Sequence, residues 1–410
     1  MKYIQMGKML GLALLVVSTS SAHADAPDAE EMWKIIQQQQ KVIEQLQQKL
    51  EKTEQKVEVA EQKVEETAQE VEAAAEAIET ASTSSGGGWW NKTSLGGYGE
   101  LHYNSREGDD QIDFHRYVLY VGHEFTDRVR FFSEWELEHS LAGEGEPGEV
   151  ELEQAWVELD INDQHRFRAG LDILPLGILN TTHEPDTFYG VERNRVESEV
   201  IPATWWEAGA GLNGELAPGW NYHVVIHSGL SVPTTGGSAG RIRSGRNKVA
   251  EANADHPAFT ANLRYTGIPG LEVAGSIQHQ QDITGGAAGN SANLYTGHID
   301  YKHSSGFGLR ALYAGWDIDD VIEAGRDDDN QDGFYIEPSY RFPISFGEIG
   351  IFGRYQQLDL ANDREEESFV VGAQWWPVER VVFKFDYEDR KDEDADTSQD
   401  IMSLGLGVSF

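Results

Sequence analysis

Residues 398–410 at the end of the chain read SQDIMSLGLGVSF, and this stretch decides the fold. Apolar side chains alternate there with small or polar ones without a break, so a β-strand over these residues is apolar on one face only. Its apolar positions are Met402, Leu404, Leu406, Val408 and Phe410. Because the same alternation recurs upstream, we expect the apolar face to contact lipid rather than a buried core.

About sixteen segments with this alternation follow one another along the chain. They are 93–104, 111–125, 128–140, 149–161, 165–173, 203–216, 220–230, 258–266, 270–281, 292–303, 307–317, 333–342, 348–359, 368–376, 380–388 and 398–410. Barrels of the bacterial outer membrane have an even number of antiparallel strands. The predicted fold is therefore an all-β transmembrane barrel of about 16 antiparallel strands over residues 93–410.

The links between these segments alternate between short and long. The short links are 126–127, 162–164, 217–219, 267–269, 304–306, 343–347 and 377–379, and the longer polar ones include 141–148, 231–257, 318–332 and 389–397. A barrel with both ends in the periplasm requires short inner turns and longer outer loops. A soluble β-sandwich, the alternative, does not require this strict alternation.

The N-terminal part of the chain predicts other structures. Residues 1–24 carry two lysines, an apolar stretch and a final Ala-His-Ala, as in a secretory signal peptide. In 25–81, branched apolar residues recur every seven positions, which predicts a periplasmic coiled coil. A single solvated amphipathic helix is the alternative, because the companion heptad positions are small or polar. The Gly/Ser-rich segment 82–92 predicts a flexible hinge before the barrel.

Composition excludes several classes of protein. There is no cysteine, so neither a disulfide framework nor a thiolate metal site can form. The formal net charge of −38 makes nucleic acid an unsuitable partner, because phosphate backbones repel so acidic a chain. After the signal peptide no stretch is apolar for long enough to form a membrane-spanning helix.

Successive side chains of a strand point to opposite sides, so the alternation of apolar and polar residues assigns each residue to one face. In 128–140, Phe131 and Trp135 point one way and Glu134 and Glu136 the other. We expect the charged inner faces to enclose water, because unpaired buried charges are very costly. Aromatic pairs near strand ends are expected at the membrane interfaces; these pairs are Trp89-Trp90, Trp205-Trp206 and Trp375-Trp376.

The loop 174–202 differs from the others because it begins with an apolar run, LPLGIL. We expect it to fold inward and narrow the channel. The alternative is an external lid whose apolar patch contacts a neighbouring subunit. If the loop folds inward, the charged residues of its later part would flank the constriction and select solutes by size and charge. They are Glu192, Arg193, Arg195, Glu197 and Glu199.

Two short motifs in this region resemble a known family. Residues 170–177 read GLDILPLG and 191–193 read VER, as in phosphate-selective porins of the O and P type. The opening strand with GGYGE at 96–100, the coiled coil and the terminal Phe410 fit the same family. The resemblance implies a sixteen-stranded trimeric channel with an inward third loop and basic residues that pass anions.

The basic residues depart from that pattern. Arginines expected to face the lumen, besides Arg116, are Arg128, Arg130, Arg166, Arg168, Arg264, Arg310, Arg341 and Arg354, and the lysine is Lys384. Lysines are otherwise scarce after the hinge, and many acids share the lumen. We therefore favour a less selective porin over a phosphate-selective one, since selectivity follows the net field at the narrowest ring.

No motif indicates catalysis or a dedicated ion site. His223 and His227 share a strand face, and the acidic runs 327–329 and 365–367 lack the spacing of a calcium loop. Neither metal nor cofactor is expected. The function expected is passive diffusion of small hydrophilic solutes and ions through a homotrimer embedded in outer-membrane lipid and lipopolysaccharide. A structural anchor that holds the cell wall through the coiled coil is the alternative.

Overall fold

The computed structural model describes residues 88–106, 108–287, 289–319, 330–361, 364–392 and 397–410, together with Trp33, Gln37 and Gln40. The chain divides into two units, Met1–Thr83 and Ser84–Phe410. Apart from those three residues, the predicted signal peptide and coiled coil lie outside the described part of the chain. In that part, no helix is long and apolar enough to cross a membrane.

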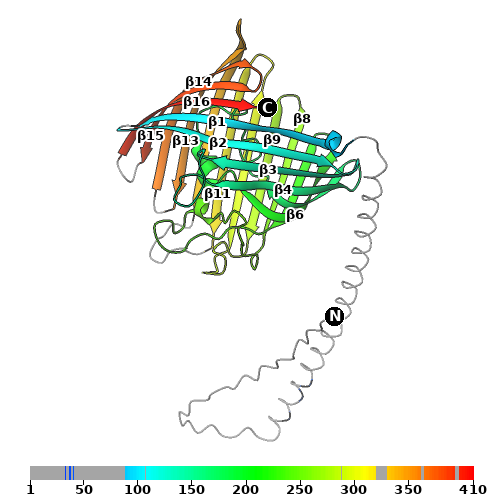
Figure 1. Cartoon of the computed structure of the whole chain (residues 1–410). Coiled ribbons are helices and arrows are strands. Elements are labelled where there is room, and N and C mark those ends of the chain that lie inside the picture. Colours follow the sequence, from blue (N-terminus) through cyan, green and yellow to red (C-terminus); the bar gives the residue numbers. More distant parts are fainter. Residues whose placement is uncertain are drawn as a thin grey trace, which may run out of the picture. The chain divides into compact units, whose positions relative to one another are not determined.

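Sixteen antiparallel strands close into a barrel, which confirms the predicted fold. The strands are β1 Thr93–Arg106, β2 Asp109–Glu124, β3 Val129–Glu138, β4 Val150–Asp160, β5 His165–Ile173, β6 Trp206–Ala217, β7 Trp220–His227, β8 Ala258–Ile268, β9 Leu271–Gln280, β10 Ala292–Lys302, β11 Phe307–Ile318, β12 Gln331–Pro343, β13 Glu348–Leu360, β14 Arg364–Val378, β15 Val381–Asp392 and β16 Thr397–Ser409. Each pairs with its neighbours in sequence, and β16 pairs with β1 (Figure 1). Phe410 extends this closure through two backbone hydrogen bonds with Gly97.

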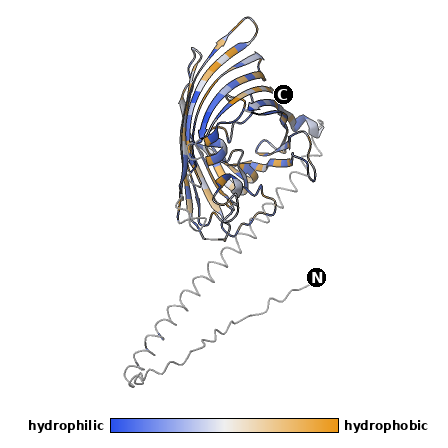
Figure 2. Ribbon diagram, turned by 90° about the vertical axis from the view of Figure 1, so that its left-hand side faces the viewer, coloured by the Kyte–Doolittle hydropathy of each residue, from blue (hydrophilic) through white to orange (hydrophobic). Residues whose placement is uncertain are grey.

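The faces of the strands alternate as the sequence predicts. On β3 the Trp135 side chain is outside and 50% exposed, whereas Glu134 and Glu136 are buried inside. On β16 the outward Leu404 is exposed and the inward Ser403 is buried. Hydrophilic and hydrophobic residues accordingly alternate along the strands (Figure 2). This arrangement pairs every strand and leaves no sheet edge, as hydrocarbon surroundings require.

The two ends of the barrel differ in their connections. The short links lie at one end, here called the turn end, and the longer loops lie at the other, here called the loop end. At the turn end, the β2–β3 link closes when the backbone N–H of Phe125 donates to the carbonyl of Val129 at 2.9 Å. Arg128 lies in this link, before β3 begins, and its side chain is exposed. It therefore lies at the rim of the turn end rather than within a strand, and its predicted place in the pore lining stays a prediction.

One predicted boundary is wrong for a structural reason. The strand expected from residue 203 begins only at Trp206, because the preceding residues belong to the loop after β5. Trp205 and Trp206 are both buried within the protein, so the expectation that this pair lies exposed at the membrane interface is wrong. Trp89 and Trp90, in a short 3-10 helix before β1, are exposed.

Candidate functional site

The loop between β5 and β6, residues 174–205 and here called L3, folds into the barrel. Asn180 joins its two ends: its amide donates to the carbonyls of Leu174 at 2.8 Å and Trp205 at 3.0 Å, and it accepts from the Trp205 N–H at 2.6 Å. The apolar start of L3, including Leu176 and Leu179, is buried. The inward fold predicted from the sequence is confirmed, and the external lid is excluded.

Inner side chains of the opposite wall hold the backbone of L3. Lys384 on β15 donates to the carbonyls of Phe188 at 3.3 Å and Gly190 at 2.8 Å, and Arg354 on β13 donates to that of Tyr189 at 2.6 Å. A charged donor on a carbonyl makes a stronger hydrogen bond than a neutral one. Lys384 and Arg354 therefore fix the loop, and both are buried.

Glu197 fixes the remainder of L3 from within. Its carboxylate accepts from the N–H groups of Ile178 at 2.7 Å and Leu179 at 2.6 Å, from Asn194 at 3.2 Å and from the Tyr335 hydroxyl at 2.8 Å. With 0% exposure it cannot contact a passing solute. Its predicted place in the constriction is wrong, because buried N–H groups, which must be satisfied, take up its oxygens.

One side of the lumen is a dry core rather than a wet channel. Apolar residues of L3 pack against the inner faces of β10 to β13, and buried residues of the loop 228–257 between β7 and β8, here called L5, complete the cluster. It includes Leu174, Leu176, Val200, Val232, Ile242, Leu294, Leu312, Ala314, Trp316, Tyr335 and Leu358. Burial of each such side chain contributes about 1.5–3 kcal/mol. The expectation that the whole interior holds water is wrong on this side.

L5 is the part of the site that sequence reasoning missed, since it was taken as an outer loop. Arg243 donates to the carbonyls of Ser198 at 2.6 Å and Ala203 at 2.9 Å, and Arg246 donates to that of Thr204. These two arginines of L5 thereby bind the backbone of L3. The signal was present in 241–248, which reads RIRSGRNK and has four basic residues and no acid in a chain of net charge −38.

Opposite the dry core, a cavity of ≈ 1030 Å³ lies between L3 and the inner faces of β1, β2 and β13 to β16. Glu192, Arg193 and Arg195 line it, and their place at the narrowest point of the channel stays a prediction. Glu199 instead lines a neighbouring cavity of ≈ 870 Å³ and pairs with Arg195 at 2.9 Å. The charged and titratable groups around the main cavity are Arg106, Arg116, Arg193, Arg195, Arg243, Arg354, Arg390, His102, His115, Glu100, Glu192, Asp386 and Glu388.

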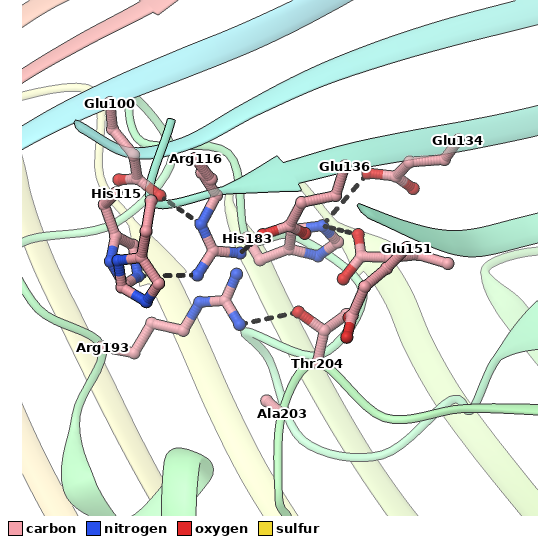
Figure 3. A network of polar contacts seen from close by, with 12 residues as sticks. Glu100, His115, Arg116, Glu134, Glu136, Glu151, His183, Arg193, Ala203 and Thr204 are labelled. Carbon is pink, nitrogen blue, oxygen red and sulfur yellow. Dashed lines mark hydrogen bonds and ion pairs between the residues drawn. The ribbon is translucent and has the colours of Figure 1, made fainter. Parts of the chain in front are cut away.

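Four arginines in and beside this cavity have no carboxylate within 4.0 Å among the described residues: the exposed Arg106, and Arg193, Arg243 and Arg246. Arg193 instead donates to the Thr204 hydroxyl at 2.7 Å (Figure 3). Burial and the charge of Arg246 lower the pKa of Arg243 to about 9, so it stays protonated at neutral pH. Arginines otherwise pair with acids around the cavity; Arg116 lies 2.8 Å from Glu100.

Glu192 is the acid of L3 that faces this cavity. It accepts from the amide of Asn104 at 2.9 Å and lies 3.0 Å from a ring nitrogen of His102 on β1. Burial acts to raise the pKa of Glu192, but the hydrogen bond and attraction to His102 prevail and hold that pKa below its usual range. L3 is thus tied to β1 by a charged group at the edge of the cavity.

The other predicted lining residues lie toward the turn end. Arg166, Arg168 and Arg264 line a cavity of ≈ 810 Å³, and Arg264, Arg310 and Arg341 one of ≈ 1350 Å³. Each is within 4.0 Å of an acid, and so is Arg130; the acids are Asp160, Glu158, Glu272, Asp300 and Glu348. These arginines therefore carry little free positive charge. Phe188 lines both the ≈ 1030 Å³ and the ≈ 1350 Å³ cavities.

The histidine pair on β7 does not form a metal site. His227 is bonded to the Thr260 hydroxyl at 2.9 Å, and His223 lies 3.9 Å from Asp172. The acidic run 327–329 lies outside the described residues.

Solved structures share this fold at low sequence identity. The anion-selective porin from Comamonas acidovorans has a TM-score of 0.53 and 13% identity, and covers 78% of this chain and 99% of its own. The Salmonella typhi OmpF complex with daunomycin has a TM-score of 0.54 and 13% identity, covering 78% and 97%. The trimer form of OmpT from Vibrio cholerae has a TM-score of 0.52 and 9% identity, covering 78% and 99%.

A closed sixteen-stranded barrel with an inward loop is the architecture of outer-membrane porins, and fold and family together point to a channel for passive diffusion. The sequence model for phosphate-selective porin O and P matches residues 96–410, and the chain belongs to that family. A curated relative, an uncharacterized protein of Aquifex aeolicus (strain VF5), is 29% identical over 349 residues, which are 73% of this chain and 77% of that protein.

Proposed function

We propose that this porin favours small hydrophilic anions over cations of similar size. The observation that carries the proposal is the cluster of Arg193, Arg243 and Arg246 at the junction of L3 and L5. None of them has a carboxylate within 4.0 Å among the described residues, whereas their hydrogen bonds go to backbone carbonyls and a hydroxyl. No carboxylate therefore pairs with them directly, although Glu136 attracts Arg193, Glu199 attracts Arg243, and Glu151 attracts Arg246 from farther away.

Coulomb's law sets the size of the effect. A unit charge about 7 Å from an ion changes the ion's energy by about 0.6 kcal/mol in bulk water and by about 2.4 kcal/mol at an effective dielectric constant of about 20. Even the smaller value changes the local concentration of a monovalent ion by about threefold. Two or three unpaired arginines therefore suffice for a measurable anion preference.

The same cavity argues for preference by charge rather than for a dedicated phosphate site. Glu100, Glu192, Asp386 and Glu388 line it together with the arginines. For a divalent anion the attraction to the arginines and the repulsion from these carboxylates both double, so the cavity's charges prefer anions as a class and do not single out phosphate. We expect chloride and small organic anions to pass, and added phosphate to leave the chloride current unblocked.

We further propose that the chain assembles as a homotrimer and that its coiled coil lies in the periplasm. Support for the trimer is the likeness of the barrel to OmpT of Vibrio cholerae, one structure of which is a trimer form. The mass of the detergent-solubilised protein tests this part. A mass of one chain would contradict it.

Neutralising two of the arginines should remove the anion preference. In Arg193→Gln with Arg243→Gln, two positive charges leave the cavity while amide donors remain, so the reversal potential in a KCl gradient should move toward the cation side. The measurement is the zero-current potential of single channels in planar bilayers.

The matched control is Arg166→Gln at the turn end, whose guanidinium pairs with Asp160 at 3.1 Å outside the main cavity. It should change the reversal potential far less than the double variant. A cation-selective wild type, or a double variant with wild-type selectivity, would contradict the proposal.

A further inference from the structure

A second cluster of ionisable side chains lies on the inner wall beside the start of L3, outside the arginine group. It consists of Glu134 on β3, Glu153 on β4 and His183 on L3, all buried, with relative exposures of 1%, 1% and 3%. One nitrogen or oxygen atom from each lies within 4.8 Å of the other two. Figure 3 shows the His183 ring directed toward Glu134.

A β-bulge brings Glu153 into this cluster. Glu134 pairs with Gln154 and the next residue, Trp135, with Leu152, so Glu153 is the extra residue on β4. Bulges redirect side chains and are frequent beside functional sites. Here the bulge directs Gln154 inward as well, where its amide donates to the second oxygen of Glu134 and leaves the first oxygen facing His183.

The orientation of His183 is that of a metal ligand. Its Nδ1 lies 3.2 Å from the carbonyl oxygen of Asn180, which can only accept, so Nδ1 carries the proton. When the ring is neutral, Nε2 presents its lone pair to the space between the two carboxylates; in the imidazolium it would donate to them instead. Histidines that bind metals commonly donate their other N–H to a backbone carbonyl in this way.

The distances fit a coordination sphere better than hydrogen bonds. Nε2 of His183 lies 3.4 Å from Glu134 Oε1 and 3.8 Å from Glu153 Oε2. Good N–H···O bonds are shorter, about 2.9–3.0 Å. Ligand atoms about 2.0–2.1 Å from a tetrahedral zinc ion are about 3.3 Å apart. A small closure of the cluster would give that geometry.

Two further observations indicate a missing partner. Glu153 Oε2 and the hydroxyl oxygen of Tyr98 are buried and have no hydrogen-bond partner within the described residues. The Tyr98 ring packs edge-on to His183, with centroids 6.0 Å apart. Glu136 is also buried here, and its nearest cation, Arg116, is shared with Glu100. Glu134, Glu136 and Glu153 thus gather in a desolvated place with Arg116 and His183 beside them and Arg193 and Arg246 farther off, and a cation among the three carboxylates would offset their mutual repulsion.

We propose that Glu134, Glu153 and His183 bind one divalent transition-metal ion of the zinc class. Mixed nitrogen and oxygen ligands suit zinc, whereas calcium prefers oxygen alone. The ion joins β3, β4 and L3, so it holds the start of the inward loop against the wall. The fourth position is open to water or to the Tyr98 hydroxyl.

The test is metal content of the full-length protein in detergent. The protein is stripped with EDTA, incubated with Zn²⁺ in the presence of excess Ca²⁺ and Mg²⁺, desalted and analysed by elemental mass spectrometry. We expect one zinc per chain. His183→Gln and Glu153→Gln should each bind zinc at least about tenfold more weakly, since even indirect partners of a metal site contribute that much.

His139→Gln is the matched control, because His139 belongs to a separate trio with Asp113 and His115. It should retain the zinc. Absence of bound zinc in the wild type, calcium in its place, or loss of zinc in His139→Gln with retention in His183→Gln would overturn the proposal. If the variants do not assemble, the visible spectrum of Co²⁺-loaded wild type decides: tetrahedral bands support the site, and their absence overturns it.

Discussion

Glu197→Ala is expected to destabilise L3 more than any other single substitution in that loop. The change removes a carboxylate that accepts four hydrogen bonds and leaves the buried N–H groups of Ile178 and Leu179 without an acceptor. Each of these two unsatisfied donors costs about 1–3 kcal/mol, so the free energy of unfolding should fall by about 2–6 kcal/mol. Denaturant unfolding in detergent, followed by tryptophan fluorescence, measures this difference.

The same variant should change conduction, because L3 loses its internal support beside the cavity. We expect larger and noisier single-channel currents than in the wild type. Glu199→Ala is the control two residues away: Glu199 pairs with Arg195, which keeps a second carboxylate, Glu366, at 2.9 Å, so this substitution should lower the free energy of unfolding less. Equal effects of the two substitutions would contradict the structural role of Glu197.

Leu404→Arg is expected to impair assembly of the barrel. Leu404 is at the middle of β16, faces outward and is 46% exposed, so the new charge would lie in hydrocarbon. The cost for arginine at the bilayer midplane is about 2–4 kcal/mol. Folding into lipid vesicles, followed by the difference in gel mobility between heated and unheated samples, measures it.

Val408→Arg serves as the depth control. Val408 also faces outward but lies four residues nearer the turn end of β16, where arginine costs about 0–1 kcal/mol. A Leu404→Arg protein that assembles as well as Val408→Arg would contradict the assignment of this face to lipid.

The strands were predictable because their signal is local. A lipid-facing side and a lumen-facing side impose period two on every strand, and the register follows from it. The inward course of L3 was also predictable, since the LPLGIL run at 174–179 is too apolar for an outer loop. The family resemblance agreed with both.

The distribution of wet and dry regions inside the barrel was not predictable in the same way. Leu312 and Arg310 are both inward on β11, yet one packs in the dry core and the other pairs with Asp300. Whether an inward side chain is covered by apolar residues depends on where L3 and L5 lie. Their positions are set by contacts between segments that are distant in sequence. The role of Glu197 has the same origin, because its partners include Tyr335 on β12.

The arginines of L5 carried a signal that was not used. Four basic residues within 241–248 stand out in an acidic chain, but their contact with L3 depends on the tertiary fold. The three residues of the proposed metal site, Glu134, Glu153 and His183, show no spacing motif in the sequence. They come from three separate segments, and a β-bulge redirects one of them.

Cysteine accessibility tests the central claim, that ions pass on the β1 and β16 side of L3 and not through the apolar side. The chain has no cysteine of its own, so single substitutions are unambiguous. Ser198 lines the ≈ 1030 Å³ cavity, and Ala314 lies in the dry core with 0% exposure. A charged methanethiosulfonate reagent should lower the single-channel current of Ser198→Cys and leave that of Ala314→Cys unchanged. Block of Ala314→Cys with no effect on Ser198→Cys would contradict the account.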